Sequence, residues 1–425
     1  MKFHVINLGC KVNKLESDQL TALFLARGAE ISQLDDADLV VINTCTVTGE
    51  ADKKARKATR SALRHNAAAQ VVVTGCASAL HPSEFSEIDT RVQVIPKASL
   101  IDVLDNRYFS AERALDAPAC PSSAPALARR VGEHFRTRVS IKIQDGCDHA
   151  CTFCIVHVAR GKARSRNAYD VIDEVLDYAQ AGVREIVLTG INTGSYCYEG
   201  ITLARLLEKL LDLTAHMHSA HQAPLRFRLS SVEPQNIDDA LIDVMAQHEG
   251  RVCRHLHLPM QSGSTRILEA MERDYSIETY LDLVARLRAK MPSIALSTDV
   301  IVGFPGETDA DFDATVHAIR TAQFCKLHVF PYSVRAGTPA ACMPHQVPEP
   351  LKRLRASMLR ALSDQLFEAD FNARIGTKEL VLVENDTALT DSYHEIARPL
   401  HSNKGDLIPI VLREQYNKVQ KNSYV

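Results

Sequence analysis

Three segments near the start of the chain share one design, a run of β-branched and apolar residues that ends in a cysteine. They are FHVINLGC (3–10), ADLVVINTC (37–45) and AQVVVTGC (69–76). Because a helix-like segment follows each run, the repeat predicts a doubly wound parallel α/β sheet. Ligands of such sheets bind beyond the carboxyl ends of the strands, so we expect Cys10, Cys45 and Cys76 to gather at that edge. The alternative is three buried thiols that act as small apolar side chains.

Composition limits how these cysteines can be interpreted. The 425-residue chain is 46% hydrophobic and 24% charged, which is typical of a soluble globular protein. No apolar run approaches the roughly 18 residues of a membrane span, and the apolar start is too short for a signal peptide. We therefore expect a cytoplasmic protein with no membrane partner, in which eleven cysteines are more typical of metal or cluster ligands than of disulfides. The net charge of −3 does not by itself favour nucleic-acid binding.

The rest of the chain suggests two further domains. From residue 136, six strand candidates alternate with amphipathic helices, fewer than the eight of a closed barrel, which predicts an open partial (β/α)6 barrel. Short strands at the C-terminal end predict a small β-barrel. An Ala-, Pro- and Ser-rich stretch that contains Cys120 predicts a linker. We expect an N-terminal domain at residues 1–115 and a linker at 116–132. A barrel domain at 133–367 and a terminal β domain at 368–425 would follow.

The segment DGCDHACTFC (145–154) places three thiols at C-x3-C-x2-C spacing. Three is too few for a structural zinc site, which usually has four protein ligands. A cubane iron–sulfur cluster held by three cysteines instead leaves one iron free for an exchangeable ligand. We therefore expect Cys147, Cys151 and Cys154 to hold a 4Fe–4S cluster. The alternative is a zinc site completed by His149 or His157.

At this loop the sequence resembles the radical S-adenosylmethionine (SAM) superfamily, whose signature is this triplet with an aromatic residue, here Phe153, before the last cysteine. The resemblance implies that SAM chelates the free iron and is reductively cleaved to methionine and a 5′-deoxyadenosyl radical. Segments 188–194, 230–234, 259–264 and 297–308 are similar to the cofactor contacts of that superfamily. The SAM contacts that the resemblance implies are Phe153, Ile155, Thr189, Gly190, Asn192, Ser231, Glu233, Gln261, Asp299 and Val300.

The two cysteine sets together, with a small terminal β domain, resemble the methylthiotransferase family from residue 2 to about residue 415. The resemblance implies a second 4Fe–4S cluster on Cys10, Cys45 and Cys76, whose free iron carries a sulfur. One SAM would methylate that sulfur, and a second would supply the radical that removes hydrogen from an aromatic carbon. Side-chain acid–base chemistry could not activate such a C–H bond.

Two short segments narrow the expected substrate. LGCKVNKLES (8–17) and NTCTVTGEADKKAR (43–56) are most similar to the branch that modifies C2 of N6-threonylcarbamoyladenosine (t6A) at position 37 of tRNA. The alternatives are the branches that act on isopentenyladenosine in tRNA or on an aspartate of a ribosomal protein, and, from another class, a zinc-bearing RNA-binding protein without catalysis. The expected partners are the tRNA anticodon loop and a reductant such as flavodoxin or ferredoxin. The sequence does not indicate the sulfur donor.

Basic residues flank both cysteine sets, and we expect them to bind tRNA phosphates rather than only to solvate the surface. Those at helical spacing after Cys45 are Lys53, Lys54, Arg56, Lys57, Arg60 and Arg64. Those after the C-x3-C-x2-C segment are Arg160, Lys162, Arg164 and Arg166. Candidates in the terminal domain, which is similar to RNA-binding TRAM modules, are Lys378, His394, Arg398, Lys404 and Arg413.

Four further side chains lie at the expected strand ends of the barrel. His255 and His257 alternate along one strand, and we expect them to fill the barrel interior. Tyr332 and Ser333 end the last strand, where we expect them to face the substrate opening.

Overall fold

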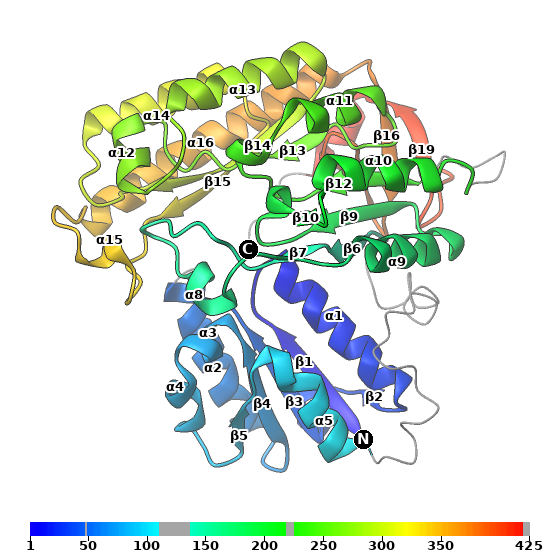
Figure 1. Ribbon diagram of the computed structural model, residues 1–425, viewed down its shortest axis with the longest axis vertical. Helices are drawn as coiled ribbons and strands as arrows, with labels where there is room; N and C mark the ends of the chain where they lie inside the picture. The colour runs from blue at the N-terminus through cyan, green and yellow to red at the C-terminus, as the bar shows by residue number, and fades with distance from the viewer. Residues whose placement is uncertain (47–48, 110–136, 218–224, 420–425) are drawn as a thin grey trace.

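The computed structural model describes residues 1–46, 49–109, 137–217 and 225–419. The N-terminal elements form a lower lobe beneath the central elements, and the C-terminal strands lie behind and above (Figure 1). The predicted linker at 116–132, with Cys120, lies outside the described residues.

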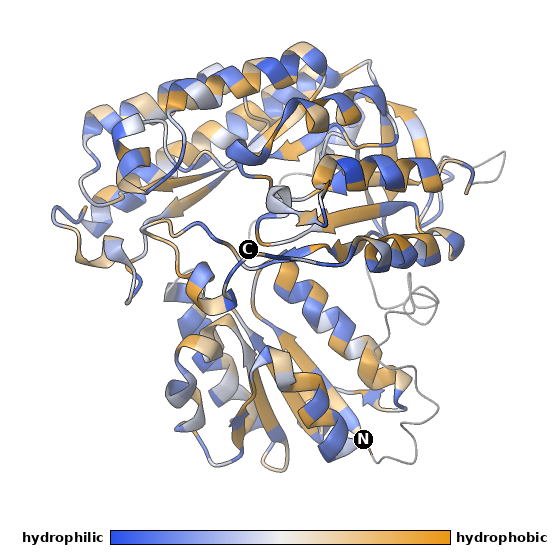
Figure 2. Ribbon diagram, viewed as in Figure 1, coloured by the Kyte–Doolittle hydropathy of each residue, from blue (hydrophilic) through white to orange (hydrophobic). Residues whose placement is uncertain are grey.

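The N-terminal lobe is built on a five-stranded parallel sheet, as the sequence predicts. Its strands, in spatial order, are β2 (Glu30–Ile31), β1 (Lys2–Asn7), β3 (Leu39–Thr44), β4 (Gln70–Gly75) and β5 (Val92–Val94). Leu39 and Val41 pack toward α1 (Lys11–Ala26) and α5 (Leu100–Tyr108), whereas Val40 and Ile42 pack toward α2 (Gly49–His65). Both faces of β3 are therefore apolar from Leu39 to Ile42, and the sheet that contains it is mostly hydrophobic in Figure 2.

The central part contains two three-stranded parallel sheets, whose strands follow one another in chain order. The first contains β6 (Val139–Lys142), β9 (Glu185–Thr189) and β12 (Arg226–Leu229), and the second contains β13 (His255–His257), β14 (Ala295–Val302) and β15 (Lys326–Pro331). Single parallel bridges, such as Ser231 to His257, join the two sheets.

Alternate residues of these strands face opposite ways. Ile186 and Leu188 of β9 join the apolar core beneath the outer helices, which leaves Glu185, Val187 and Thr189 on the inner side. The helices that contribute to this core include α9 (Ala168–Gln180), α10 (Leu203–Leu213), α11 (Asp239–Gln247), α13 (Ile277–Lys290), α14 (Asp309–Ala322) and α16 (Glu349–Arg374).

The C-terminal strands form one antiparallel sheet. Its order is β18 (Glu395–Ala397), β17 (Thr387–Thr390), β16 (Lys378–Val383) and β19 (Leu407–Val411). The sheet is docked by the buried Arg228 of β12, whose guanidinium donates to the carbonyl of Thr390 at 3.0 Å and contacts Glu185 at 2.9 Å. The predicted boundary at residues 367/368 falls inside α16, because Leu359 packs into the central core and Phe371 of the same helix packs against the C-terminal strands.

Arg160 joins the N-terminal lobe to the segment that carries the C-x3-C-x2-C motif. This residue ends α8 (Val156–Arg160), and its guanidinium donates to Asn13 Oδ1 at 2.7 Å, Glu16 Oε1 at 3.0 Å and Asp145 Oδ1 at 3.0 Å. Only 4% of the side chain is exposed. The expectation that Arg160 binds tRNA phosphate is therefore wrong, because its charge is already used inside the protein.

Neighbouring cations keep the two carboxylates of this junction ionised. Burial acts to raise the pKa of Glu16, but the charges of Lys97 and Arg160 outweigh it and lower that pKa to about 2. The pKa of Asp145 is lowered to about 2 in the same way, with burial opposed by Lys142 and Arg160.

Acid should therefore weaken this junction. The folded-state pKa of Glu16 lies below its ordinary value of 4.5, so the unfolded chain binds more protons between about pH 4.5 and 2. The stabilisation is fully present above that range and is lost as the pH falls through it. We expect Glu16→Gln to lower the urea midpoint of unfolding at pH 7 and to lie closer to the wild type at pH 3. The exposed Glu50→Gln control should match the wild type throughout, and an equal deficit of Glu16→Gln at both pH values would contradict this prediction.

Candidate active site

The N-terminal cysteines lie at one edge of the sheet, as the sequence predicts. Cys10, Cys45 and Cys76 each directly follow one of the adjacent strands β1, β3 and β4. Asn13 ties the first two segments together, since its Nδ2 donates to the carbonyl of Thr44 at 2.8 Å. Cys10 is exposed, whereas Cys45 and Cys76 are buried.

Glycine is required immediately before two of the six predicted ligands. Gly75 has φ +107°, and a Cβ there would lie 2.3 Å from the carbonyl oxygen of Thr44. Gly146 has φ +74°, and a Cβ there would lie 2.0 Å from the carbonyl oxygen of Lys162. A side chain at either position would displace the backbone that carries Cys76 or Cys147.

The second set lies on the segment between β7 (Gln144–Asp145) and α8. Burial raises the pKa of Cys147 and Cys151, and raises that of Cys154 to about 12; the other two thiolates add to the shift of Cys154. The three sulfurs are thus close enough to influence one another. A bound cation would stabilise thiolates that burial otherwise disfavours, so this donor set fits iron.

Neither cysteine set is arranged to hold a single metal ion. Within the described ranges, no three Cys, His, Asp or Glu side chains are close enough to share one metal ion. In a cubane cluster each thiolate binds a different iron, so its ligands need not converge on one point. Ligation by either cysteine set stays a prediction.

Arg273 is a site residue that sequence reasoning missed. Its Nη1 donates to Cys151 Sγ at 3.4 Å, and its Nη2 forms an ion pair with Glu233, a predicted SAM contact. Only 3% of its side chain is exposed. The segment MERDY around it matches no motif, and its partners lie 40 and 122 residues away, so no local signal could have identified it.

Several predicted SAM contacts share one cavity with a motif cysteine. A cavity of about 200 Å³ is lined by Cys154, Phe153, Ile155, Gln261 and Asp299. The same cavity is lined by Tyr332, Ser333 and Arg335. That Tyr332 and Ser333 face the substrate opening stays a prediction.

Other predicted contacts lie around Gln144, whose Oε1 accepts hydrogen bonds from the backbone N–H groups of Ile191 at 3.1 Å and Asn192 at 2.9 Å. A Cβ on Gly190 would lie 2.9 Å from the same oxygen. Thr189 Oγ1 and Asn192 Oδ1 are buried and have no hydrogen-bond partner in the described part of the chain, whereas most buried polar atoms in proteins have one.

The remaining predicted contacts differ in orientation. Glu233 is half-buried and held by Arg273, and Ser231 lies at the bridge to β13. The Val300 side chain packs in the apolar core beneath the helices, so only its backbone could meet a cofactor on the inner side.

The histidines of β13 fill the interior, as predicted, and also hold a predicted contact in place. His257 Nε2 lies 3.2 Å from Asp299 Oδ1, and His257 and His255 both contact Ser297 Oγ at 2.9 Å. Burial lowers the pKa of His255 well below its ordinary value, so this imidazole is neutral.

The predicted tRNA-binding residues fall into two groups. Lys53, Lys54, Lys57, Arg60 and Arg64 are exposed along α2, as are Lys162, Arg164, Lys378, Lys404 and Arg413 elsewhere. By contrast, Arg56 pairs with Glu84 and Arg166 pairs with Glu174. Arg398 is exposed too, and its guanidinium donates to the carbonyl of Asn385. His394 is wrong as a tRNA ligand, because its side chain is 1% exposed and bonds Asp370 at 2.7 Å.

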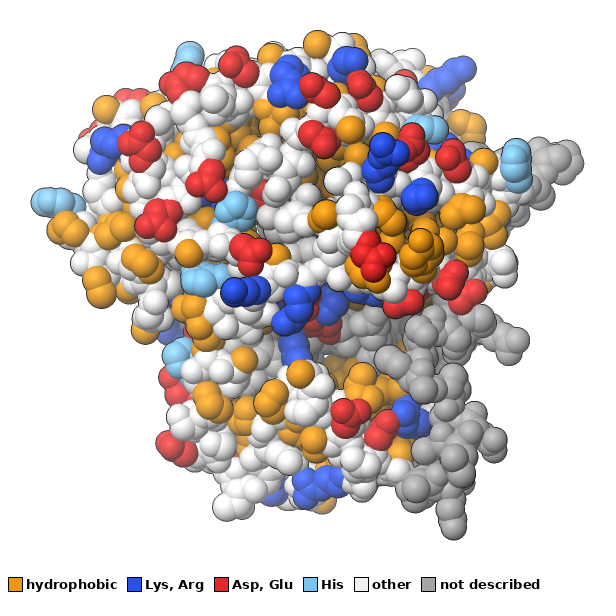
Figure 3. Space-filling view, in the orientation of Figure 1, with side chains coloured by type: hydrophobic (Ala, Val, Ile, Leu, Met, Phe, Trp, Pro, Cys, Tyr) orange, Lys and Arg blue, Asp and Glu red, His pale blue; other side chains and the backbone are white. Residues whose placement is uncertain are grey.

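On the face drawn in Figure 3, basic side chains gather along the seam between the lower lobe and the central elements. None of the described helices is long and apolar enough to cross a membrane.

Comparison with known families and proteins supports the sequence interpretation. The radical SAM superfamily matches residues 141–319, and the family described as uncharacterized protein family UPF0004 matches residues 2–96. Threonylcarbamoyladenosine tRNA methylthiotransferase MtaB of Bacillus subtilis is 40% identical over 86% of this chain and 80% of its own length. The protein of the same name from Aquifex aeolicus is 33% identical over 97% of this chain and its whole length.

Two further matches define how far the likeness extends. The tRNA-2-methylthio-N(6)-dimethylallyladenosine synthase of Endomicrobium trichonymphae is 34% identical over 90% of this chain and 89% of its own length. Among solved structures, the radical SAM methyltransferase TsrM from Kitasatospora setae superposes with a TM-score of 0.55 at 16% identity, covering 80% of this chain and 77% of that one. At that identity the structural likeness shows the fold alone.

The sequence relatives span most of both chains at above 30% identity, and the cysteine signature lies in the segment matched by the radical SAM superfamily. The chain therefore belongs to the radical SAM methylthiotransferases represented by MtaB, enzymes that use S-adenosylmethionine and iron–sulfur chemistry.

Proposed function

We propose that this protein converts t6A at position 37 of tRNA to its 2-methylthio derivative. The observation that carries the proposal is the presence of two three-cysteine sets, one at the edge of the N-terminal sheet and one on the segment that Arg160 ties to it. The MtaB relatives at 40% and 33% identity support t6A as the substrate. The dimethylallyladenosine synthase at 34% identity makes that nucleoside the second candidate.

In this proposal Cys147, Cys151 and Cys154 hold one 4Fe–4S cluster and the N-terminal cysteines hold another. The first cluster with SAM supplies the radical chemistry, and the second supplies the sulfur. Arg273 orients Cys151 and Glu233 through its two contacts. The unpaired oxygens of Thr189 and Asn192 are available to bind polar groups of SAM.

We further propose the domain plan that the sequence suggests, with residues 133–367 as a partial (β/α)6 barrel and residues 368–425 as a TRAM-like RNA-binding module. The six parallel strands in chain order support the first, and the antiparallel terminal sheet supports the second. The N-terminal domain would end at residue 115. The reductant would be a flavodoxin or ferredoxin.

Single cysteine substitutions should separate the two clusters. After anaerobic reconstitution we expect about eight iron atoms per wild-type chain, and about four in Cys151→Ala and in Cys45→Ala. Cys151→Ala should lose SAM cleavage, whereas Cys45→Ala should keep cleavage and lose methylthiolation, measured by 5′-deoxyadenosine release and nucleoside mass spectrometry. The exposed Cys197→Ala is the matched control and should retain both activities. Equal loss of both activities in the two variants, or stoichiometric zinc in place of iron, would contradict the division of labour.

The substrate can be identified in cells that lack the gene. We expect mass spectrometry of total tRNA nucleosides to show that 2-methylthio-t6A disappears while t6A remains, and that the gene restores it. Loss of the 2-methylthio derivative of isopentenyladenosine, or of the methylthio group on the ribosomal protein, would assign the enzyme to another branch.

The exposed cations of α2 should contribute to tRNA affinity. The double variant Lys54→Gln/Lys57→Gln removes two charges that make no ion pair within the described chain. We expect weaker tRNA binding, measured by fluorescence anisotropy. The slope of log affinity against log salt concentration should become shallower by about one unit for each lost phosphate contact. The double variant Arg205→Gln/Lys209→Gln, which removes two exposed charges from the outer helix α10, is the control for net charge. An unchanged salt slope in the double variant would remove α2 from the tRNA interface.

A further inference from the structure

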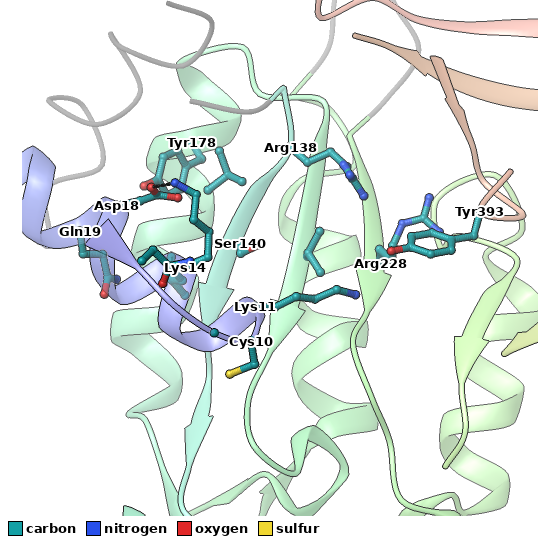
Figure 4. Close-up of a pocket in the computed structure, with 15 residues that line it drawn as sticks. Cys10, Lys11, Lys14, Asp18, Gln19, Arg138, Ser140, Tyr178, Arg228 and Tyr393 are labelled. Carbon is teal, nitrogen blue, oxygen red and sulfur yellow. Dashed lines mark hydrogen bonds and ion pairs between the residues drawn. The ribbon is translucent and has the colours of Figure 1, made fainter. Parts of the chain in front are cut away.

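A second and larger cavity lies where the three parts of the chain meet. It has a volume of about 530 Å³, within the range of small-molecule sites. Its lining includes Cys10 and Lys11 at the start of α1 and Arg138 directly before β6. Ser140 of β6, Arg228 of β12 and Tyr393 also line it (Figure 4). None of the predicted SAM contacts lines it, so this cavity is separate from the one beside Cys154.

Most of the charged side chains that line the cavity are cations. Its charged lining residues are Lys11, Lys14, Arg138, Arg228 and a single carboxylate, Asp18. Three of the four cations are paired: Lys14 with Asp18 at 2.6 Å, Arg138 with Glu384 at 3.5 Å and Arg228 with Glu185 at 2.9 Å. Lys11 differs, because no carboxylate in the described part of the chain pairs with it. Its ammonium instead lies 5.5 Å from the centre of the Tyr393 ring, toward which it points in Figure 4.

Tyr393 is held rigidly opposite Lys11. It has φ +74°, a conformation uncommon for a non-glycine residue and kept only where the surroundings enforce it. The ring stacks on His255 at 4.3 Å and lies 5.1 Å from the Arg228 guanidinium. Burial acts to raise the pKa of Tyr393, yet Lys11, Arg138 and Arg228 outweigh it and lower that pKa. The cavity therefore favours negative charge.

The position of the cavity relates it to the reaction. Cys10 is a predicted ligand of the sulfur-bearing cluster, and its neighbour Lys11 points into the cavity. A base whose C2 lies near that cluster must place the substituent on N6 in nearby space. In t6A this substituent ends in a free carboxylate, whereas the dimethylallyl group is uncharged and apolar.

We propose that the cavity binds the threonyl carboxylate of the substrate nucleoside, with Lys11 as its ion-pair partner and the Tyr393 hydroxyl as a hydrogen-bond donor. The inference rests on the proposed function and adds the residues that select the substrate. An apolar substituent would leave the Lys11 ammonium and the Tyr393 hydroxyl facing a group that cannot bind them, which disfavours the wrong nucleoside.

The test compares two RNAs that differ only in this charge. Anticodon stem-loops carrying t6A or its carboxylate methyl ester are titrated against the reconstituted wild type and Lys11→Gln. We expect the wild type to bind the acid about tenfold more tightly than the ester, because the cavity walls partly exclude water. Lys11→Gln should bind both RNAs with the wild-type affinity for the ester. Tyr393→Phe should show an intermediate preference, and the outer-surface control Lys209→Gln should keep the full tenfold. Iron content is measured for every variant, because Lys11 adjoins Cys10.

The possible outcomes are distinct. A preference for the acid that persists unchanged in Lys11→Gln would overturn the inference while leaving the proposed function intact. Equal weakening of acid and ester in Lys11→Gln would also overturn it, since that pattern indicates a general effect on RNA binding. If the wild type methylthiolates neither RNA but modifies a dimethylallyladenosine stem-loop, the proposed function itself is wrong.

Discussion

The buried guanidinium of Arg160 is the interaction on which the rest of the site depends. It binds Asn13 and Glu16, which follow Cys10 by three and six residues, and Asp145, which precedes Cys147 by two residues. A buried charge of this kind is stable only while its partners are present. Removing any one partner would therefore destabilise the junction strongly. Arg160 thus fixes the segment after Cys10 against the segment that precedes Cys147.

A second buried arginine fixes the other side of the same junction. Arg335, beyond the end of β15, pairs with Asp52 of α2 at 2.6 Å and also contacts the Thr46 hydroxyl directly after Cys45. The edge of the N-terminal sheet is therefore held at two places, near Cys10 and near Cys45. Radical chemistry requires such fixed geometry, because a reactive intermediate must meet its target before it meets anything else.

The local features of this arrangement could be predicted from the sequence. Apolar runs defined the strands β1, β3 and β4, and the parallel order then placed Cys10, Cys45 and Cys76 at one edge. What the sequence could not reveal was the pairing of charges across long separations. Arg160 and His394 looked like surface cations because their partners, Glu16 and Asp370, lie 144 and 24 residues away. Arg273 was missed for the same reason. The sequence likewise did not reveal that the Val300 side chain packs in the apolar core, which leaves its backbone as the predicted cofactor contact.

The most direct test of the proposed two-cluster arrangement is the magnetic coupling between the two reduced clusters, measured by electron paramagnetic resonance on reconstituted protein. If Arg160 holds the two cysteine sets close together, the spins of the two clusters should couple and broaden each other's signals. Arg160→Ala should then weaken that coupling while the iron content stays the same. Two independent, unbroadened cluster signals in the fully loaded wild type would contradict the arrangement on which the proposed sulfur transfer depends.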